Sequence, residues 1–163
     1  MEKKIMDILW APWRMSFVRK KKQKGCFLCQ ASKQEKAVSV LWKGSYSIVV
    51  LNIFPYNNGH FMIAPIAHKG DIEKLSQDEI NEMAQILKRS IKIVNKTLKP
   101  HGYNIGMNLG TCAGAGIPDH LHIHVVPRWI GDTNFMPVIA STKVIPQSIE
   151  ELSKVLKKEF LKI

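Results

Sequence analysis

Alternation of apolar and polar residues along several short segments predicts β-strands. In a strand, successive side chains point to opposite faces, so alternation marks one buried face and one polar face. Alternating segments and short apolar runs bounded by turn residues cover residues 38–42, 47–52, 60–65, 103–109 and 120–125. The pattern therefore predicts about five strands.

Two other segments repeat apolar residues every three or four positions, which predicts amphipathic helices. The first follows Ser76, which forms a capping-box pattern with Glu79, and ends near Pro100. Its apolar stripe consists of Ile80, Met83, Leu87, Ile91, Val94 and Leu98. The second follows Ser148, and its apolar side consists of Ile149, Leu152, Leu156 and Phe160. We expect both stripes to pack into the core.

Length and charge narrow the picture further. A chain of 163 residues can bury a full core as one domain. Its net charge of +11 favours polyanionic partners, either nucleic acid or a phosphate-rich small molecule, although solubility alone explains much of it. The basic runs at 19–24 and 154–162 are not interleaved with aromatic residues, so nucleic-acid binding is not expected. With no long apolar run and no signal peptide, we expect no membrane association and a cytoplasmic protein.

The polar face of the last predicted strand consists of imidazoles only. His120, His122 and His124 alternate with Leu121, Ile123 and Val125, so the three rings would line one face while the apolar residues pack into the core. Imidazole changes protonation near neutral pH and also ligates metals. The run therefore indicates either acid–base and nucleophilic chemistry or a metal site, with a plain polar strand face as the less attractive interpretation.

The cysteines suggest a second kind of site. There are three, Cys26, Cys29 and Cys112, and an odd number in a chain expected in the cytoplasm argues against a disulfide framework. The Cys26-x-x-Cys29 pair is typical of half a zinc site or of a redox pair.

A loop with little side-chain bulk leads into the histidines. Residues 110–117 include Gly110, Gly114 and Gly116, and such loops can present backbone N–H groups to an anion. Next to three imidazoles, the loop suggests a phosphate-binding function.

The run His120-Leu121-His122-Ile123-His124-Val125-Val126 resembles the signature of the histidine triad family of nucleotidyl hydrolases and transferases. Residues 9–17, which contain two tryptophans and a phenylalanine, and residues 131–147 resemble the bacterial diadenosine tetraphosphate (Ap4A) phosphorylase branch of that family. From the sequence alone, the aromatic residues of 9–17 fit core packing better than stacking on a base.

The resemblance implies a covalent mechanism. His122 takes the place of the nucleophile that attacks the α-phosphate and becomes adenylylated, while His124 contacts phosphate oxygens. His60 corresponds to the histidine that opens a strand after a glycine, and we count it with the catalytic residues.

The resemblance also implies the residues that bind the substrate. Asn52 takes the ribose-contacting position, and Ile53 and Phe54 fall where the family lines its base pocket. Around the phosphates we expect Asn108, Gly114, Gly116, Lys143 and Gln147. Where relatives have Gln followed by Ser or Thr, this chain has Gly116 and Ile117, so backbone N–H groups, Thr111 or Ser141 would have to replace those side chains.

Relatives with Cys-x-x-Cys often complete a zinc site with two histidines. The corresponding set here is Cys26, Cys29, His68 and His120, which would form a closed, structural Cys₂His₂ site. The resemblance therefore implies structural zinc rather than free thiols, and no organic cofactor.

Three functions compete. The first is phosphorolysis of Ap4A by inorganic phosphate to ADP and ATP through adenylyl-His122. The second is hydrolysis, either of nucleoside phosphoramidates and other adenylylated compounds or of Ap4A to AMP and ATP. The third is a non-catalytic nucleotide-binding or zinc-stabilised module, which the intact triad makes the weakest. The resemblance to the phosphorylase branch favours the first.

The fold implied by the resemblance is α+β, a histidine-triad fold with an antiparallel sheet of about five strands, one long helix and a C-terminal helix. We expect one domain over residues 1–163, with a basic N-terminal extension at 1–24 and a C-terminal segment and helix at 131–163. The family also implies a homodimer or a larger homo-oligomer.

Overall fold

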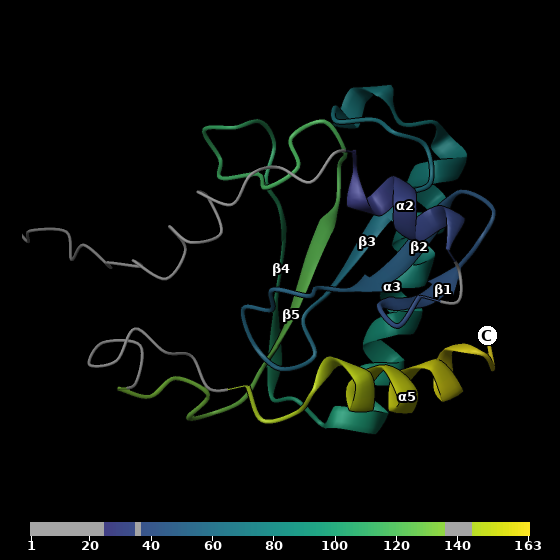
Figure 1. The fold of residues 1–163 in the computed structure, drawn as a ribbon. Helices are drawn as coiled ribbons and strands as arrows, with labels where there is room; N and C mark the ends of the chain where they lie inside the picture. The colour runs from purple at the N-terminus through teal and green to yellow at the C-terminus, as the bar shows by residue number, and fades with distance from the viewer. Residues whose placement is uncertain (1–24, 35–36, 136–144) are drawn as a thin grey trace, which may run out of the picture.

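A single antiparallel sheet forms the centre of the protein. The computed structural model describes residues 25–34, 37–135 and 145–163. Its strands are β1 (Val40–Lys43), β2 (Ser47–Leu51), β3 (Phe61–Pro65), β4 (Gly102–Met107) and β5 (Ile123–Arg128), in the order β1-β2-β3-β5-β4 (Figure 1). Each neighbouring pair is antiparallel. The predicted sheet is thereby confirmed, with strand ends that shift by a few residues.

Helices cover the two faces of the sheet unequally. Helices α3 (Gln77–Leu98) and α5 (Ile149–Phe160) pack against one face, and the short helix α2 (Phe27–Lys33) packs against the other (Figure 1). A single 3₁₀ turn at Ile72–Lys74 precedes α3. Since α2 lies over β1, β2 and β3, the opposite half of that face, along β5 and β4, is left for the histidines.

The two long helices begin as the sequence predicts. The hydroxyl of Ser76 accepts from the N–H of Glu79 while the Glu79 carboxylate accepts from the N–H of Ser76, a complete capping box. The Ser148 hydroxyl accepts from the N–H of Glu151 at the start of α5. Both caps satisfy N–H groups that a helix end leaves without an internal partner.

The buried stripe of α3 is rotated relative to the predicted one. Ile80 is 41% exposed, and the apolar side chains that are buried are those of Met83, Ile86, Ile93 and Val94. Leu87 lies only at the edge of this core. Two overlapping sets of apolar residues in α3 have helical spacing. The predicted set includes Ile80 and Leu87, and packing against β2 and β3 instead buries the set that includes Ile86 and Ile93.

Helix α2 is an addition to the elements predicted from the sequence, which include no helix over Phe27–Lys33. Cys26 occupies its N-cap without a side-chain hydrogen bond, so local capping does not hold it. Leu28 and Ala31, three residues apart, are instead buried against Ile48, Val50 and Met62 of the sheet. Tertiary packing therefore forms this helix, which brings the Cys26–Cys29 pair to the histidine face.

The histidine strand is shorter than the sequence suggests. Strand β5 begins at Ile123, so His120 and His122 lie in the segment that leads into it. Leu121 and Val125 are buried and Ile123 packs against the same core, as the alternation predicts. Within the described residues, no helix has the length and apolarity needed to cross a membrane.

Candidate active site and metal centre

Three histidines meet on the sheet face that α2 leaves open. His124 pairs with Met62 of β3 in the strand register, which brings it beside His60, the residue that precedes β3. The ring centroids of His60 and His124 are 5.2 Å apart, and those of His122 and His124 are 4.7 Å apart. The fold thus places the three predicted catalytic histidines in one contiguous row.

One nitrogen of His122 is held by the backbone. Its Nδ1 lies 2.8 Å from the carbonyl oxygen of His120, and a carbonyl can only accept, so Nδ1 carries the hydrogen. Burial lowers the pKa of His122, partly offset by this hydrogen bond. A neutral ring protonated on Nδ1 has its lone pair on Nε2, which makes that nitrogen the potential nucleophile.

The tautomers of His60 and His124 follow from one backbone N–H. The Tyr56 N–H donates to Nδ1 of His60 at 3.0 Å, so this nitrogen carries no hydrogen. The remaining hydrogen of His60 is then on Nε2, which lies 3.1 Å from Nδ1 of His124 and donates to it. In neutral His124 the hydrogen is therefore on Nε2, where it can be donated to a substrate.

The predicted nucleoside-binding residues lie on the loop between β2 and β3. The carboxamide oxygen of Asn52 accepts from the N–H of Phe54 at 2.9 Å, and its nitrogen lies 3.3 Å from Nδ1 of His60. Ile53 and Phe54 are 48% and 49% exposed. Two large apolar side chains left half-exposed beside the histidine row are suited to contact a base.

The predicted phosphate-binding residues do not all lie together beside the histidine row. Asn108 follows β4, and Gly116 lies in the loop before the histidines. The N–H of Gly114 donates to the carbonyl of Thr111 at 3.1 Å, so it is engaged within the loop. Gln147 accepts from Asn58 at 2.8 Å, beside the loop between β2 and β3. Lys143 lies outside the described residues, as do Ser141 and the whole of segment 9–17.

Four potential metal ligands gather where α2 meets the start of the histidine run. Cys26, Cys29, His68 and His120 each offer a ligand atom, and these atoms lie within 4.8 Å of one another. Nδ1 of His120 is 3.2 Å from Sγ of Cys26 and 3.4 Å from Sγ of Cys29. Sequence positions up to 94 residues apart thus converge on one point.

The hydrogen bonds fix which nitrogen of His120 faces the cluster. Its Nε2 lies 2.8 Å from the carbonyl oxygen of Pro65 and must donate to it, which leaves the lone pair on Nδ1. Nδ1 of His68 lies 3.2 Å from Nδ1 of His120. Ligand atoms at zinc bond lengths of 2.0–2.3 Å in a tetrahedron lie about 3.3–3.8 Å apart. The donor set suits a zinc ion, and the distances of 3.2–3.4 Å between neighbouring ligand atoms lie close to that range.

An ion pair at the far end of β5 was not anticipated from the sequence. The Asp132 carboxylate accepts from Nε and Nη2 of Arg128 at 2.6 and 2.8 Å, and also from Nδ2 of Asn57 at 2.7 Å. The hydrogen bonds from Arg128 hold the pKa of Asp132 well below its usual range. An Arg and an Asp four residues apart look like ordinary surface charges, and only the fold reveals their contact with Asn57.

Known proteins resemble this chain in sequence and in fold. The chain is 35% identical over 162 residues to an AP-4-A phosphorylase of Mycobacterium tuberculosis, covering 93% of this chain and 83% of that protein. It is 27% identical over 103 residues to an adenosine 5'-monophosphoramidase of Schizosaccharomyces pombe, covering 63% and 74%. A zinc-bound histidine triad family protein from Mycobacterium smegmatis has the same fold, with a TM-score of 0.67 at 22% identity over 84% of this chain and 94% of that one.

The match to the HIT domain spans residues 33–129, from the end of α2 to just past β5. This range contains the histidine row, the loop between β2 and β3, and two of the four potential metal ligands. The chain belongs to the HIT domain family.

Proposed function

We propose that the protein cleaves Ap4A with inorganic phosphate, giving ADP and ATP through an adenylyl group held on His122. The observation that carries this proposal is the hydrogen bond from Nδ1 of His122 to the His120 carbonyl, which directs the lone pair of a buried imidazole outward from Nε2. The 35% identity to an AP-4-A phosphorylase over most of both chains supports the choice of substrate.

In the first step, Nε2 of His122 attacks the α-phosphorus, forming a P–N bond as the P–O bond to the rest of Ap4A breaks. In this proposal, Nε2–H of His124 donates to the departing ATP or to the oxygens that gain charge. His60 supports that donor, because its own Nε2–H is directed at Nδ1 of His124. In the second step an oxygen of inorganic phosphate attacks the same phosphorus, the P–N bond breaks, and ADP leaves.

The remaining residues have supporting roles in this proposal. Asn52 contacts the ribose, Ile53 and Phe54 contact the base, and Asn108 and the N–H of Gly116 stabilise charge on the phosphoryl oxygens. Lys143 and Gln147 are candidates for the incoming phosphate; release of Gln147 from Asn58 would be required for that contact.

Zinc is the metal that best suits Cys26, Cys29, His68 and His120. Two thiolates and two imidazoles are the ligands of closed tetrahedral zinc sites, in which the ion is structural. Zinc here would join α2 to the segment before β5 and so fix the carbonyl of His120, the acceptor that orients His122. The fold of a zinc-bound relative is consistent with this assignment.

Assembly is a further part of the proposal. Strand β4 is an edge of the sheet and most of its residues are exposed, including Ile105 at 45% and Met107 at 40%. An open edge with apolar residues is suited to pair with another strand. We propose a homodimer joined at β4, with each chain forming one domain over 1–163. Sedimentation of the purified protein should give a mass of at least two chains, and a monomer would contradict this.

Product analysis distinguishes phosphorolysis from hydrolysis. Purified protein incubated with Ap4A should form ADP and ATP in a reaction whose rate depends on added phosphate. Formation of AMP and ATP at a rate independent of phosphate would instead identify a hydrolase. Turnover of adenosine 5'-phosphoramidate but not of Ap4A would favour the activity named for the S. pombe relative.

Substitution of His122 tests the nucleophile. His122→Gly should lower kcat by at least about a thousandfold while Ap4A still binds, because the covalent step is lost. His124→Ala should lower kcat less, since only a donor is lost. His101→Ala is a matched control: His101 is an exposed histidine that accepts from the N–H of Ile130, away from the row. Near-normal kcat in His122→Gly would reject the assignment.

A further inference from the structure

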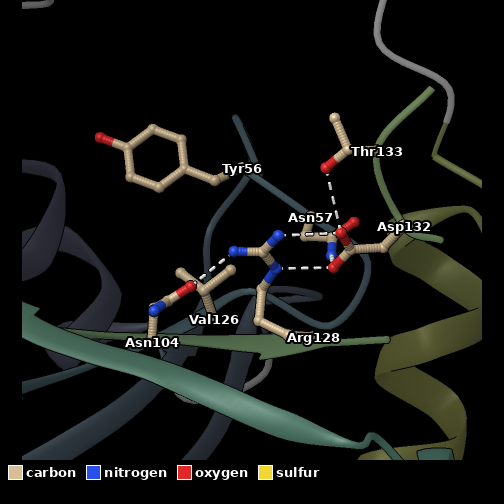
Figure 2. A pocket seen from close by; sticks show the side chains of 7 residues that line it. All are labelled: Tyr56, Asn57, Asn104, Val126, Arg128, Asp132 and Thr133. Atoms are coloured by element: carbon tan, nitrogen blue, oxygen red, sulfur yellow. Dashed lines mark hydrogen bonds and ion pairs between the residues drawn. The ribbon is translucent and has the colours of Figure 1, made fainter. Parts of the chain in front are cut away.

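A pocket lies on the histidine face of the sheet, around the Arg128–Asp132 ion pair and outside the predicted site residues. It has a volume of about 250 Å³ at the end of β5, with Val126 and Arg128 from β5 and Asn104 from β4 among its lining residues (Figure 2). Asn104 pairs with Val126 in the strand register. In a strand, residues two apart share a face, so Val126 and Arg128 continue the row that His124 begins.

Tyr56 connects this pocket to the histidine row. Its ring stacks on His60 with centroids 4.8 Å apart and lies 5.7 Å from the ring of His124, and the same residue lines the pocket. The four residue steps from His124 to Arg128 span about 13 Å of extended strand. The distance from the pocket to a phosphorus at His122 is therefore too long for one phosphate group to span. The far end of a polyphosphate chain can reach the pocket.

The charges of the pocket argue against a phosphate as its occupant. The guanidinium of Arg128 is already engaged: Nε and Nη2 donate to Asp132, and Nη1 donates to Asn104 at 2.6 Å. Figure 2 shows the guanidinium lying between these two partners. The Arg128 charge is thus offset by a carboxylate that would repel an anion. A neutral group suits the pocket better.

The lining chemistry is suited to a nucleoside. A planar guanidinium and an aromatic ring both stack on flat heterocycles, here Arg128 and Tyr56. Asn104 and Thr133 are exposed: the Asn104 amide nitrogen can donate, and the Thr133 hydroxyl, which donates to Asp132 at 3.2 Å, can still accept from a base edge or a ribose hydroxyl. Flat surfaces combined with a few amide and hydroxyl groups are the usual means of holding a base.

We propose that this pocket binds the second nucleoside of the dinucleoside polyphosphate, the one carried away on the leaving nucleotide. The inference rests on the proposed function, because it assumes adenylyl transfer to His122. The first nucleoside lies at Asn52, Ile53 and Phe54, the phosphate chain passes His124, and the second nucleoside reaches Arg128. The pocket would then select substrates by the length of the phosphate chain and by the presence of a second nucleoside.

Two substrates test the proposal within each protein preparation. Ap4A and adenosine 5'-tetraphosphate donate the same adenylyl group, but only Ap4A carries a second nucleoside. Thr133→Tyr and Asn104→Tyr each introduce a ring from a different side of the pocket. Each should lower the ratio of kcat/KM for Ap4A to kcat/KM for adenosine 5'-tetraphosphate by about tenfold, the scale expected when one stacked base is displaced. Asn81→Tyr is the matched control, since Asn81 is an exposed residue of α3 whose amide also accepts a hydrogen bond.

The outcomes separate this inference from the proposed function. A ratio that stays within twofold of wild type in both variants, while Ap4A is still cleaved through His122, overturns the second-nucleoside site alone. An equal loss for both substrates also overturns it, because the pocket would then act on the phosphate chain or on folding. If wild-type protein cleaves neither substrate, the proposed function fails and this inference fails with it.

Discussion

The two ends of the histidine segment are fixed by different chemistry. Before β5, His120 is fully buried and lies beside two thiols and a second imidazole, the groups that the proposed zinc ion would join. At the end of β5, Arg128 is fixed by Asp132, so the two charges offset each other without any added ion. With zinc bound as proposed, one end would depend on the metal supply while the other depends only on the chain, with the proposed catalytic row between them.

Removing the metal should have the largest effect on stability. When free zinc is present at about a thousand times its Kd, binding adds about 4 kcal/mol to the free energy of unfolding. A domain of this size loses roughly 2–4 °C in Tm for each kcal/mol of stability lost. We therefore expect Cys26→Ser with Cys29→Ser to lower Tm by about 10 °C, with a smaller proportional effect on kcat at 25 °C. Elemental analysis should give about one zinc per chain in wild-type protein and none in the variant. Wild-type protein purified without zinc would reject the metal assignment.

Breaking the other end should have an intermediate effect. Asp132→Asn removes the charge that Arg128 and Asn57 contact, which we expect to cost about 1–2 kcal/mol, because half-exposed Arg128 can regain water. Thermal unfolding should show Tm lower by about 4 °C. Zinc content should remain at the wild-type value, which would show that the two ends are independent. A Tm equal to wild type would mean that the ion pair does not hold the strand.

The smallest effect should come from a contact behind the metal ligands. Lys69 follows His68 and forms an ion pair of 2.7 Å with buried Glu79. Burial raises the pKa of Glu79, but the hydrogen bonds from Lys69 and Ser76 outweigh it and the pKa is lowered overall. Lys69→Ala should therefore cost less than about 1 kcal/mol at pH 7.

The pH dependence of this small effect has a definite sign. A carboxylate with a lowered pKa stabilises the fold above its unfolded pKa of about 4.3, and loses that contribution as pH falls through its folded pKa. The Tm difference between wild type and Lys69→Ala should thus shrink below about pH 4. Lys74→Ala is the matched control, because Lys74 pairs with Asp71 on the surface and should change Tm little at pH 7. A difference that grows in acid would contradict the assignment.

Sequence patterns predict those parts of the molecule that depend on local periodicity. Alternation around His122 predicts which neighbours are buried, and Ser76 and Ser148 mark the starts of the long helices. Resemblance to a family was needed to connect Cys26 with His120, because no local pattern relates positions 94 residues apart. The structure brings these residues together, and their roles as zinc ligands remain a prediction.

Features formed by tertiary contact could not be predicted. Helix α2 has no capping side chain, and burial of Leu28 and Ala31 forms it. The contact between Asn57 and Asp132 joins two loops whose residues suggest only turns. One signal was available: a buried amide needs partners, and an Asn-Asn pair directly before a Gly-His strand start is a reason to search for them.

A main-chain N–H determines which ring nitrogen carries the hydrogen in His60 and His124. The N–H of Tyr56 determines that Nδ1 of His60 is an acceptor, and this determines the tautomer of His124 in turn. Every amino acid except proline supplies that N–H. During evolution, position 56 can therefore exchange its side chain, and with it one wall of the neighbouring pocket, while keeping the N–H that fixes the tautomers of the histidine row. With the pocket and the row acting as proposed, substrate preference would drift at this position while the chemistry is inherited.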